Sequence, residues 1–403
     1  MGREGWRMKK KVIALLLGCF SLIGCVPQNS AQFTPASQVE AIAAKPPLPV
    51  YKSSINLGSN FYVARLAYSP DGRYLAIADE GSSTIVIWDV EQNHEQARIH
   101  TRSNEGQPTW PSKWSHWNPG ENIHWSPDGR LITNGVGKFQ SGWKGDLLKT
   151  IEFWDPMTGK VVHELPAIAI NGLLRFNQDG SKLLVHSGQF AKEYRYSFTV
   201  YDTHTWQSKD YDTDGVMINK LAWTLDSKVL VVGIPYIDDN TLMRLADGRI
   251  IPQGATVARL IDTSNKQEPI TTILFPPHKA GVAVYICHLL LPDFVNQRAV
   301  LVGNDGSLLL LDTRTMKIDY FIEATQLKRP SDGLWGEGLS LNGKYLFLGN
   351  LDYNEQNGSF IFNLDTGQQV GHFASENITT LALNPNSKTL AIGQNNKVLF
   401  YKL

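Results

Sequence analysis

The sequence predicts an all-β protein folded as a seven-bladed β-propeller, and three observations lead to this fold class. A strand, turn, strand, strand pattern recurs seven times between about residue 50 and residue 403. The last copy ends directly after its third strand. A β-prone stretch that could supply the missing strand, Tyr51–Leu57, lies directly before the first copy.

The first copy shows the pattern most clearly. Leu66–Tyr68 is β-prone, and the chain then turns at Pro70-Asp71-Gly72, where proline and glycine favour a tight reversal. A second strand follows the turn. The third strand, Thr84–Asp89, ends in the dipeptide Trp88-Asp89. This order predicts three consecutive antiparallel strands.

Six further copies follow in the same order. They begin at Ile123, Leu174, Leu221, about Val284, Leu339 and Leu381, and their third strands end at Asp155, Asp202, Asp262, Asp312, Asn363 and Lys402. The recurring order resembles the WD40 repeat, and the resemblance covers residues 50–403. It implies seven four-stranded blades in which Trp88, Asp89 and their equivalents belong to the blade architecture. A propeller of the quinoprotein-like or lactonase-like kind is the alternative, because the usual Gly-His pair is clear only at Gly371-His372.

The ends of the repeat region predict how the ring closes. An unpaired outer edge would leave backbone groups free to pair with other chains. We therefore expect Tyr51–Leu57 to complete the last blade as its fourth strand.

The N-terminal residues predict export and lipidation. Basic residues at Arg7 and Lys9–Lys11 precede the apolar run Val12–Phe20, which is too short for a membrane span. The run leads into Leu22-Ile23-Gly24-Cys25, which resembles the lipobox of bacterial lipoproteins. The resemblance implies that Cys25 carries acyl chains such as palmitate and becomes the first residue of the mature protein. An ordinary signal peptide is the alternative.

These features predict three segments. They are a signal peptide at 1–24, a flexible tether rich in Ala, Pro, Ser and Gln at 25–49, and the propeller at 50–403. Val26 follows the cysteine, where an aspartate would indicate retention in the inner membrane. We expect a protein anchored in the bacterial cell envelope, at the outer membrane and facing the periplasm.

Composition excludes several function classes. Lys plus Arg equal Asp plus Glu at 38 each, so no positive field favours nucleic acid. Of the three cysteines only Cys287 lies in the propeller region, which excludes a disulfide framework and a cysteine metal site there. No linear motif of a hydrolase, metalloprotease, phosphate loop or dinucleotide site is present. We therefore expect no cofactor, and an enzyme is the less favoured interpretation.

Long connections predict a ligand-binding face. In WD40 propellers the turn between the second and third strands and the link between blades lie on one face, the top face. Here these connections are long at Glu91–Glu121, Val136–Lys149, Gly188–Tyr194, Pro235–Ala255 and Asp352–Gly358. The candidate ligand-binding residues in them are Trp110, Trp114, Trp117, Trp143, Tyr236, Asp238 and Asp239. Alternatively, the tryptophans pin their loops to the propeller and the two aspartates form a solvated turn.

Two functions compete on these grounds. The favoured one is an envelope-anchored scaffold that holds a protein or peptide partner, or a cell-wall glycan, on its top face. The alternative is an extracytoplasmic propeller enzyme of the lactonase, lyase or hydrolase kind. Its catalytic groups would converge from several blades at the central mouth and leave no linear motif.

Overall fold

The computed structural model describes the greater part of the repeat region. The described residues are 49–79, 82, 84–101, 123–135, 150–165, 174–186, 197–213, 215–235, 250–251, 255–264, 271–275, 287–303, 308–322, 327–328, 337–339, 343–353, 356–373, 378–386 and 388–403. The chain divides into two compact units, 1–43 and 44–403, and all described residues belong to the second. Within them every regular element is a β-strand, and no helix is long and apolar enough to cross a membrane.

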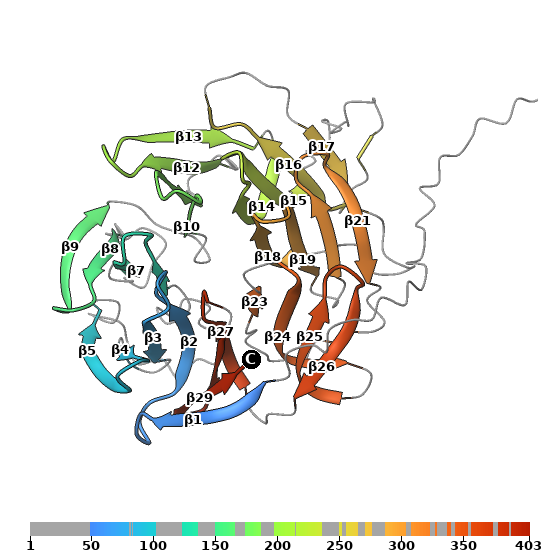
Figure 1. Ribbon diagram of the computed structural model, residues 1–403. Helices are drawn as coiled ribbons and strands as arrows, with labels where there is room; N and C mark the ends of the chain where they lie inside the picture. Colours follow the sequence, from blue (N-terminus) through green and yellow to red (C-terminus); the bar gives the residue numbers. More distant parts are fainter. Residues whose placement is uncertain are drawn as a thin grey trace, which may run out of the picture. The chain divides into compact units, whose positions relative to one another are not determined.

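The strands form seven antiparallel sheets that follow one another around a ring, as the sequence predicts (Figure 1). Blade 1 contains β2 (Val63–Tyr68), β3 (Tyr74–Asp79), β4 (Thr84–Asp89) and β5 (His94–His100). Blade 2 contains β6 (Ile123–Trp125), β7 (Leu131–Gly135), β8 (Thr150–Asp155) and β9 (Lys160–Leu165). Blade 3 contains β10 (Leu174–Phe176), β11 (Lys182–Val185), β12 (Ser197–Asp202) and β13 (Ser208–Asp212).

The other four blades repeat this order. Blade 4 contains β14 (Val216–Trp223), β15 (Val229–Pro235), β16 (Val257–Ile261) and β17 (Thr271–Leu274). Blade 5 contains β18 (Cys287–Asp293), β19 (Arg298–Gly303), β20 (Leu308–Asp312) and β21 (Lys317–Ile322). Blade 6 contains β22 (Leu327–Lys328), β23 (Glu337–Leu339), β24 (Tyr345–Tyr353), β25 (Gln356–Asn363) and β26 (Gln368–Phe373). Blade 7 contains β27 (Ile378–Leu383), β28 (Thr389–Gln394), β29 (Lys397–Lys402) and β1 (Val50–Asn56).

The predicted closure of the ring by the N-terminal strand is confirmed. Strand β1 pairs antiparallel with β29, with Val50 opposite Lys402 and Asn56 opposite Lys397. The rings of Tyr51 and Tyr401 also meet edge to face, with centroids 5.9 Å apart. The outer edge of β29 is thereby paired rather than exposed.

The core of the propeller lies between the blades. The described residues form seven apolar clusters, and each cluster joins two neighbouring blades. In ring order from the blade 7 to blade 1 junction, representative pairs are Phe400 and Ile77, Ile87 and Leu131, Phe153 and Leu183, Phe198 and Trp223, Leu230 and Leu301, Val302 and Phe360, and Phe347 and Leu390. Successive strand residues point to opposite faces of their sheet, so each inner sheet packs against both neighbours. The ring is therefore a continuous, rigid support.

The prediction that Glu91–Glu121 is one long link between blades 1 and 2 was wrong in its first part. Residues His94–His100 form β5, the fourth strand of blade 1, and the link begins after it. His100 accordingly lies in a strand rather than in a loop, and its Nδ1 is 3.2 Å from Thr84 Oγ1. The polar sequence of β5 resembles a loop because the strand is the outermost of its blade and largely exposed.

The prediction that Asp352–Gly358 is a loop was also wrong. Strands β24 and β25 continue their pairing through Asp352 opposite Asn357 and Tyr353 opposite Gln356, so the segment is mostly a long hairpin. Strand β22 adds a further short partner, because Leu327 pairs with Tyr353. Blade 6 is therefore extended by regular structure.

Candidate functional site

The sequence-predicted site residues all lie outside the described residues. They are Cys25, Trp110, Trp114, Trp117, Trp143, Tyr236, Asp238 and Asp239. Their roles stay predictions. What the structure describes is the ring and the strand ends that flank the connections containing the four tryptophans, Tyr236 and the two aspartates.

Blade connectivity defines two faces of the ring. The turns between the first and second strands and between the third and fourth strands of a blade lie at one end, which we call the bottom face. The turns between the second and third strands, and the links between blades, lie at the opposite end, the top face. This follows because consecutive strands in each blade are antiparallel.

The bottom-face turns repeat one hydrogen-bond arrangement. In blade 1 the hydroxyl of Ser69 donates to Asp71 Oδ1 over 2.6 Å and accepts from the backbone N–H of Tyr74 over 2.9 Å. In blade 4 Thr224 Oγ1 donates to Asp226 Oδ1 over 2.5 Å and accepts from the backbone N–H of Lys228. These short side chains satisfy turn amides that the strands leave unpaired. Asp71 and Asp226 thus have a structural role in their turns.

The aspartate of the Trp-Asp dipeptide secures the other bottom turn of blade 1. Asp89 accepts from the backbone N–H of Gln92 over 2.8 Å and pairs with the Arg73 guanidinium at 3.0 Å. Burial raises the pKa of Asp89, but the hydrogen bonds from Gln92 and Arg73 outweigh burial and hold the pKa below its usual range. These contacts agree with the interpretation of Asp89 as part of the blade architecture.

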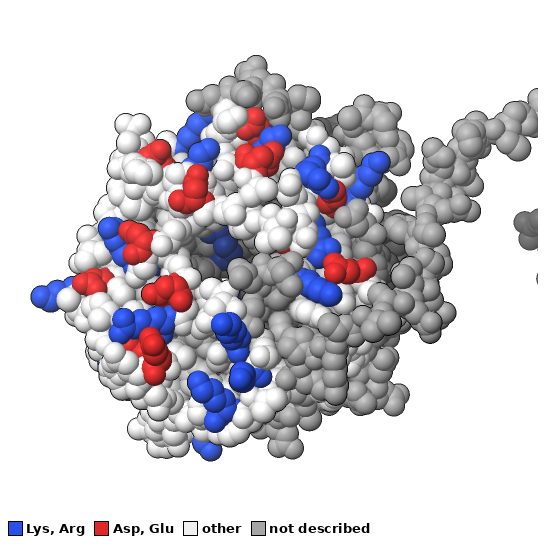
Figure 2. Space-filling view, viewed as in Figure 1, with Lys and Arg blue, Asp and Glu red and all other residues white. Residues whose placement is uncertain are grey.

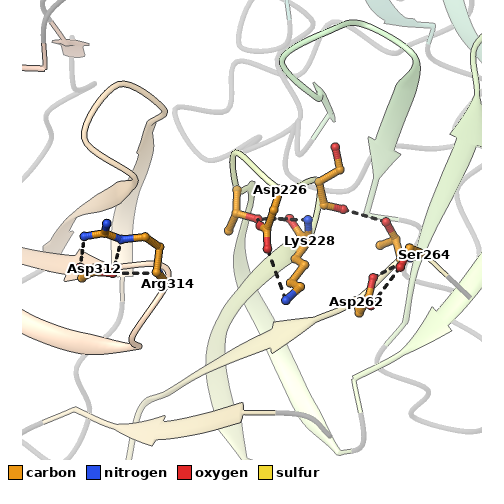
Figure 3. A network of polar contacts seen from close by, with 9 residues as sticks. Asp226, Lys228, Asp262, Ser264, Asp312 and Arg314 are labelled. Atoms are coloured by element: carbon orange, nitrogen blue, oxygen red, sulfur yellow. Dashed lines mark hydrogen bonds and ion pairs between the residues drawn. The ribbon is translucent and has the colours of Figure 1, made fainter. Parts of the chain in front are cut away.

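Charged side chains on the bottom of blades 4 and 5 are paired inside their own turns (Figure 3). The contacts are Lys228 Nζ with Asp226 Oδ2 at 3.3 Å, Ser264 Oγ with Asp262 Oδ2 at 3.0 Å, and Arg314 with Asp312 Oδ2 at 2.9 Å. The Arg314 guanidinium lowers the pKa of Asp312 to about 2. These local pairs stabilise turns rather than converge on a ligand.

A groove of about 760 Å³ opens on the bottom face between blades 1 and 2. The β2–β3 turn, the β6–β7 turn and the β8–β9 turn supply its walls, and Tyr74 and Trp125 add aromatic surface. Sequence reasoning missed this groove because it interpreted these turns only as hairpin signals. One signal was present: Ser-Pro-Asp-Gly-Arg occurs at both 69–73 and 126–130, so two consecutive blades present the same turn.

The innermost strands bring polar groups toward the axis of the ring. Arg175 on β10 lies 3.1 Å from Nε2 of His124 on β6, so residues of two blades meet there. Trp223 donates from Nε1 to the carbonyl oxygen of Arg175 over 2.9 Å, which adds a third blade. Figure 2 shows a hollow near the axis with Lys or Arg atoms inside it. Among the described residues, no group of three or more His, Cys, Asp or Glu side chains is placed to hold a metal ion.

On the top face, the described strand ends include one buried anchoring carboxylate. Asp79, at the end of β3, is 2% exposed. It accepts from the backbone N–H of Tyr62 over 2.6 Å and from that of Ser82 over 2.8 Å. Asp79 therefore holds the connection to β4 against the link that enters blade 1.

Comparisons with known proteins agree with this architecture. Residues 52–89 match the family model "WD domain, G-beta repeat". No curated protein matches the chain. Among solved structures, the fold is similar to the β-propeller domain of Cps50 (Swd1) from Myceliophteria thermophila, with a TM-score of 0.58 and 14% sequence identity, over 88% of this chain and 99% of that chain. At this identity the likeness shows the fold alone: a seven-bladed β-propeller that carries a WD40-like repeat.

Proposed function

We propose that this protein is a scaffold of the bacterial cell envelope, anchored by acyl chains on Cys25, that binds a protein, peptide or cell-wall ligand with its top face. The observation that carries the proposal is the asymmetry between the two faces. The described bottom turns are short and hydrogen-bonded, whereas the segments between β5 and β6, β7 and β8, and β15 and β16 are long. Extended connections on one end of a rigid ring are typical of binding surfaces.

The rigid ring supports the same proposal. Apolar clusters join all seven blades to their neighbours, so the strand ends that flank the top-face connections lie at fixed relative positions. A preorganised surface loses less conformational entropy when a partner binds. WD40-type propellers generally serve as platforms for protein partners, which favours a protein or peptide over other ligands.

The position of β1 is compatible with an anchor that leaves the top face accessible. Val50, the first residue of β1, lies opposite Lys402, and the backbone N–H of Leu403 donates to the carbonyl oxygen of Lys388 in a bottom turn. The chain before Val50 therefore joins the ring at the bottom face. A flexible tether over residues 25–49 would span roughly 25–30 Å. A lipid anchor on Cys25 would thus be tethered to the ring at the bottom face, at the end opposite the top-face connections.

Site-specific crosslinking in the bacterial cell tests the binding face. A photo-crosslinking amino acid is placed at Trp114 or Trp143, and at Leu225 or Val295 as bottom-face controls, which are 39% and 64% exposed. We expect one defined envelope protein or glycan to be captured from the Trp114 or Trp143 position and not from the controls. Two results would contradict the proposal. One is equal capture of the partner from top-face and bottom-face positions, and the other is no capture from either top-face position.

Metabolic labelling with an alkyne analogue of palmitate tests the anchor. Label should be incorporated in the wild-type protein and in Cys19→Ala, and it should be lost in Cys25→Ala. Retention of label in Cys25→Ala would reject Cys25 as the lipidated residue. The two experiments separate the anchor from the binding face.

A further inference from the structure

The blade 1–2 groove on the bottom face has apolar walls that no described residue covers. Its apolar lining comprises Pro70, Tyr74, Trp125, Pro127, Pro156, Met157 and Val162. Met157 is 47% exposed and Val162 is 51% exposed, although both are large apolar residues. Exposed apolar surface that is concentrated in a concave site indicates a binding surface more often than scattered exposure does.

The rim of this groove carries an excess of negative charge. Three carboxylates, Asp71, Asp128 and Asp155, line it together with one guanidinium, Arg130. Arg130 Nε lies 3.2 Å from Asp128 Oδ2, so those two charges offset each other. Asp71 and Asp155 are left without a cationic side chain in the lining.

Neither remaining carboxylate is paired with a cationic side chain in the turns. Asp71 accepts hydrogen bonds at Oδ1 from Ser69 and from the backbone N–H of Arg73, and the residue is exposed. Arg73 itself is committed to the buried Asp89 at 3.0 Å. The donors to Asp155 are neutral: the backbone N–H of Met157 and the hydroxyl and backbone N–H of Thr158. Both carboxylates therefore retain charge that a cationic ligand can neutralise.

The groove is also held in a fixed shape. Trp125 donates from Nε1 to the carbonyl oxygen of Ala67 over 2.9 Å, which connects the inner strands of the two blades below the groove. The hydroxyls of Ser69 and Ser126 fix the two turns at its edges. A site that needs no rearrangement binds without the cost of ordering its own loops.

We propose that the blade 1–2 groove binds an extended peptide segment that carries Lys or Arg side chains next to an apolar or proline residue. The apolar residue packs against Trp125, Met157 and Val162, and the cationic groups pair with Asp71 and Asp155. The groove volume of about 760 Å³ fits a segment of a few residues. The site is on the face opposite the proposed top-face surface, and the two can fail independently.

Fluorescence anisotropy on the full-length chain in detergent tests the proposal. The probes are two labelled eight-residue peptides, one in which lysine alternates with leucine and proline, and one with glutamate in place of each lysine. We expect the lysine peptide to bind at least about tenfold more tightly, and its affinity to fall as salt is raised.

Matched variants locate the binding. Asp71→Asn keeps the Oδ1 acceptor that the turn uses and removes the charge, and Val162→Ser removes exposed apolar surface. Each should weaken binding of the lysine peptide by about three- to tenfold. Asp226→Asn, the same turn position in blade 4, and Val295→Ser, an exposed valine in blade 5, should leave binding unchanged.

Three outcomes would overturn the proposal. They are no binding of the lysine peptide, equal binding of both peptides, and equal loss in the groove and control variants. Circular dichroism of each variant confirms that the propeller stays folded, so a loss of binding is assigned to the groove.

Discussion

The side chain of Asn384 in blade 7 donates a hydrogen bond of 2.7 Å to the carbonyl oxygen of Gly72 in blade 1. The two residues are far apart in the sequence and lie in equivalent bottom-face turns. This contact closes the ring a second time, in addition to the β1–β29 pairing. Gly72 has φ +73°, and a Cβ at this position would lie 2.3 Å from Asn384 Oδ1. Both the backbone conformation and the available space therefore require glycine.

We predict that Gly72→Ala destabilises the propeller by about 2–3 kcal/mol, because it adds backbone strain and displaces Asn384. Gly129→Ala is the matched control, since Gly129 has φ +84° in the equivalent turn of blade 2 and a Cβ there meets nothing within 4 Å. The control should cost about 1 kcal/mol, from backbone strain alone. Urea unfolding followed by tryptophan fluorescence measures both. Equal losses would mean that the contact with Asn384 contributes nothing.

We predict that Ile55→Asp opens the ring at blade 7. Ile55 on β1 is 7% exposed and packs in the cluster that joins blades 7 and 1. A buried carboxylate there should cost more than about 3 kcal/mol and free the edge of β29 for intermolecular pairing. Val50→Asp, on the same strand but 66% exposed, is the control and should have little effect. Light scattering during thermal unfolding checks the prediction, which fails if both variants aggregate alike.

Acid should remove a stabilising contribution from the Asp312–Arg314 pair. The pKa of Asp312 is lowered from 3.8 to about 2, chiefly by the Arg314 side chain, so its ionised form is favoured in the folded state. This stabilisation is complete above pH 4 and is lost as the pH falls from about 4 to about 2. At pH 7 we expect Asp312→Asn and Arg314→Ala each to cost about 1 kcal/mol or less. A double-mutant cycle that shows no coupling at pH 7 would refute the assignment.

A buried histidine predicts a separate loss of stability at mildly acid pH. His186, directly after β11, is 9% exposed, and its Nδ1 has no hydrogen-bond partner among the described residues. Burial lowers the pKa of His186 from 6.5 to about 4, so the unfolded chain takes up a proton at a higher pH than the folded one. Stability contributed by the neutral imidazole is therefore present above pH 6.5 and is lost as the pH falls toward 4.

His186→Phe tests this dependence. Between pH 7.5 and pH 4.5 the wild-type protein should lose about 1–3 kcal/mol more stability than the variant. His204→Asn, at an exposed turn position, should follow the wild type. Parallel pH curves for the wild type and His186→Phe would show that the imidazole does not titrate with unfolding.

The blade pattern and the ring closure could be predicted because their signals are local. The Pro-Asp-Gly turns and the β-prone runs are written in consecutive residues, and a third strand without a partner requires one from elsewhere. Strand β5 was missed for an equally local reason. Its residues His94–His100 are mostly polar and exposed, so they lack the apolar alternation by which strands are recognised.

The hairpin of β24 and β25 was missed because its tip, Asp352–Gly358, has a loop-like composition. Tyr345–Leu348 pair with Phe360–Asn363 farther down the blade, and the register shifts between Leu348 and Leu351 before the tip residues pair. Register is a property of two strands together, and it is not visible in either segment alone.

By itself, the sequence determined that the chain forms seven blades, that β1 completes the last one, and that long connections gather on one face. Each of these depends on the order of strands and turns along the chain. Only the tertiary structure decided which distant groups meet. The blade 1–2 groove combines residues 69–74, 125–130 and 155–162, and the Asn384–Gly72 contact joins the two ends of the repeat array. Such contacts depend on how neighbouring blades pack, because packing sets the distance between turns that share no local sequence signal.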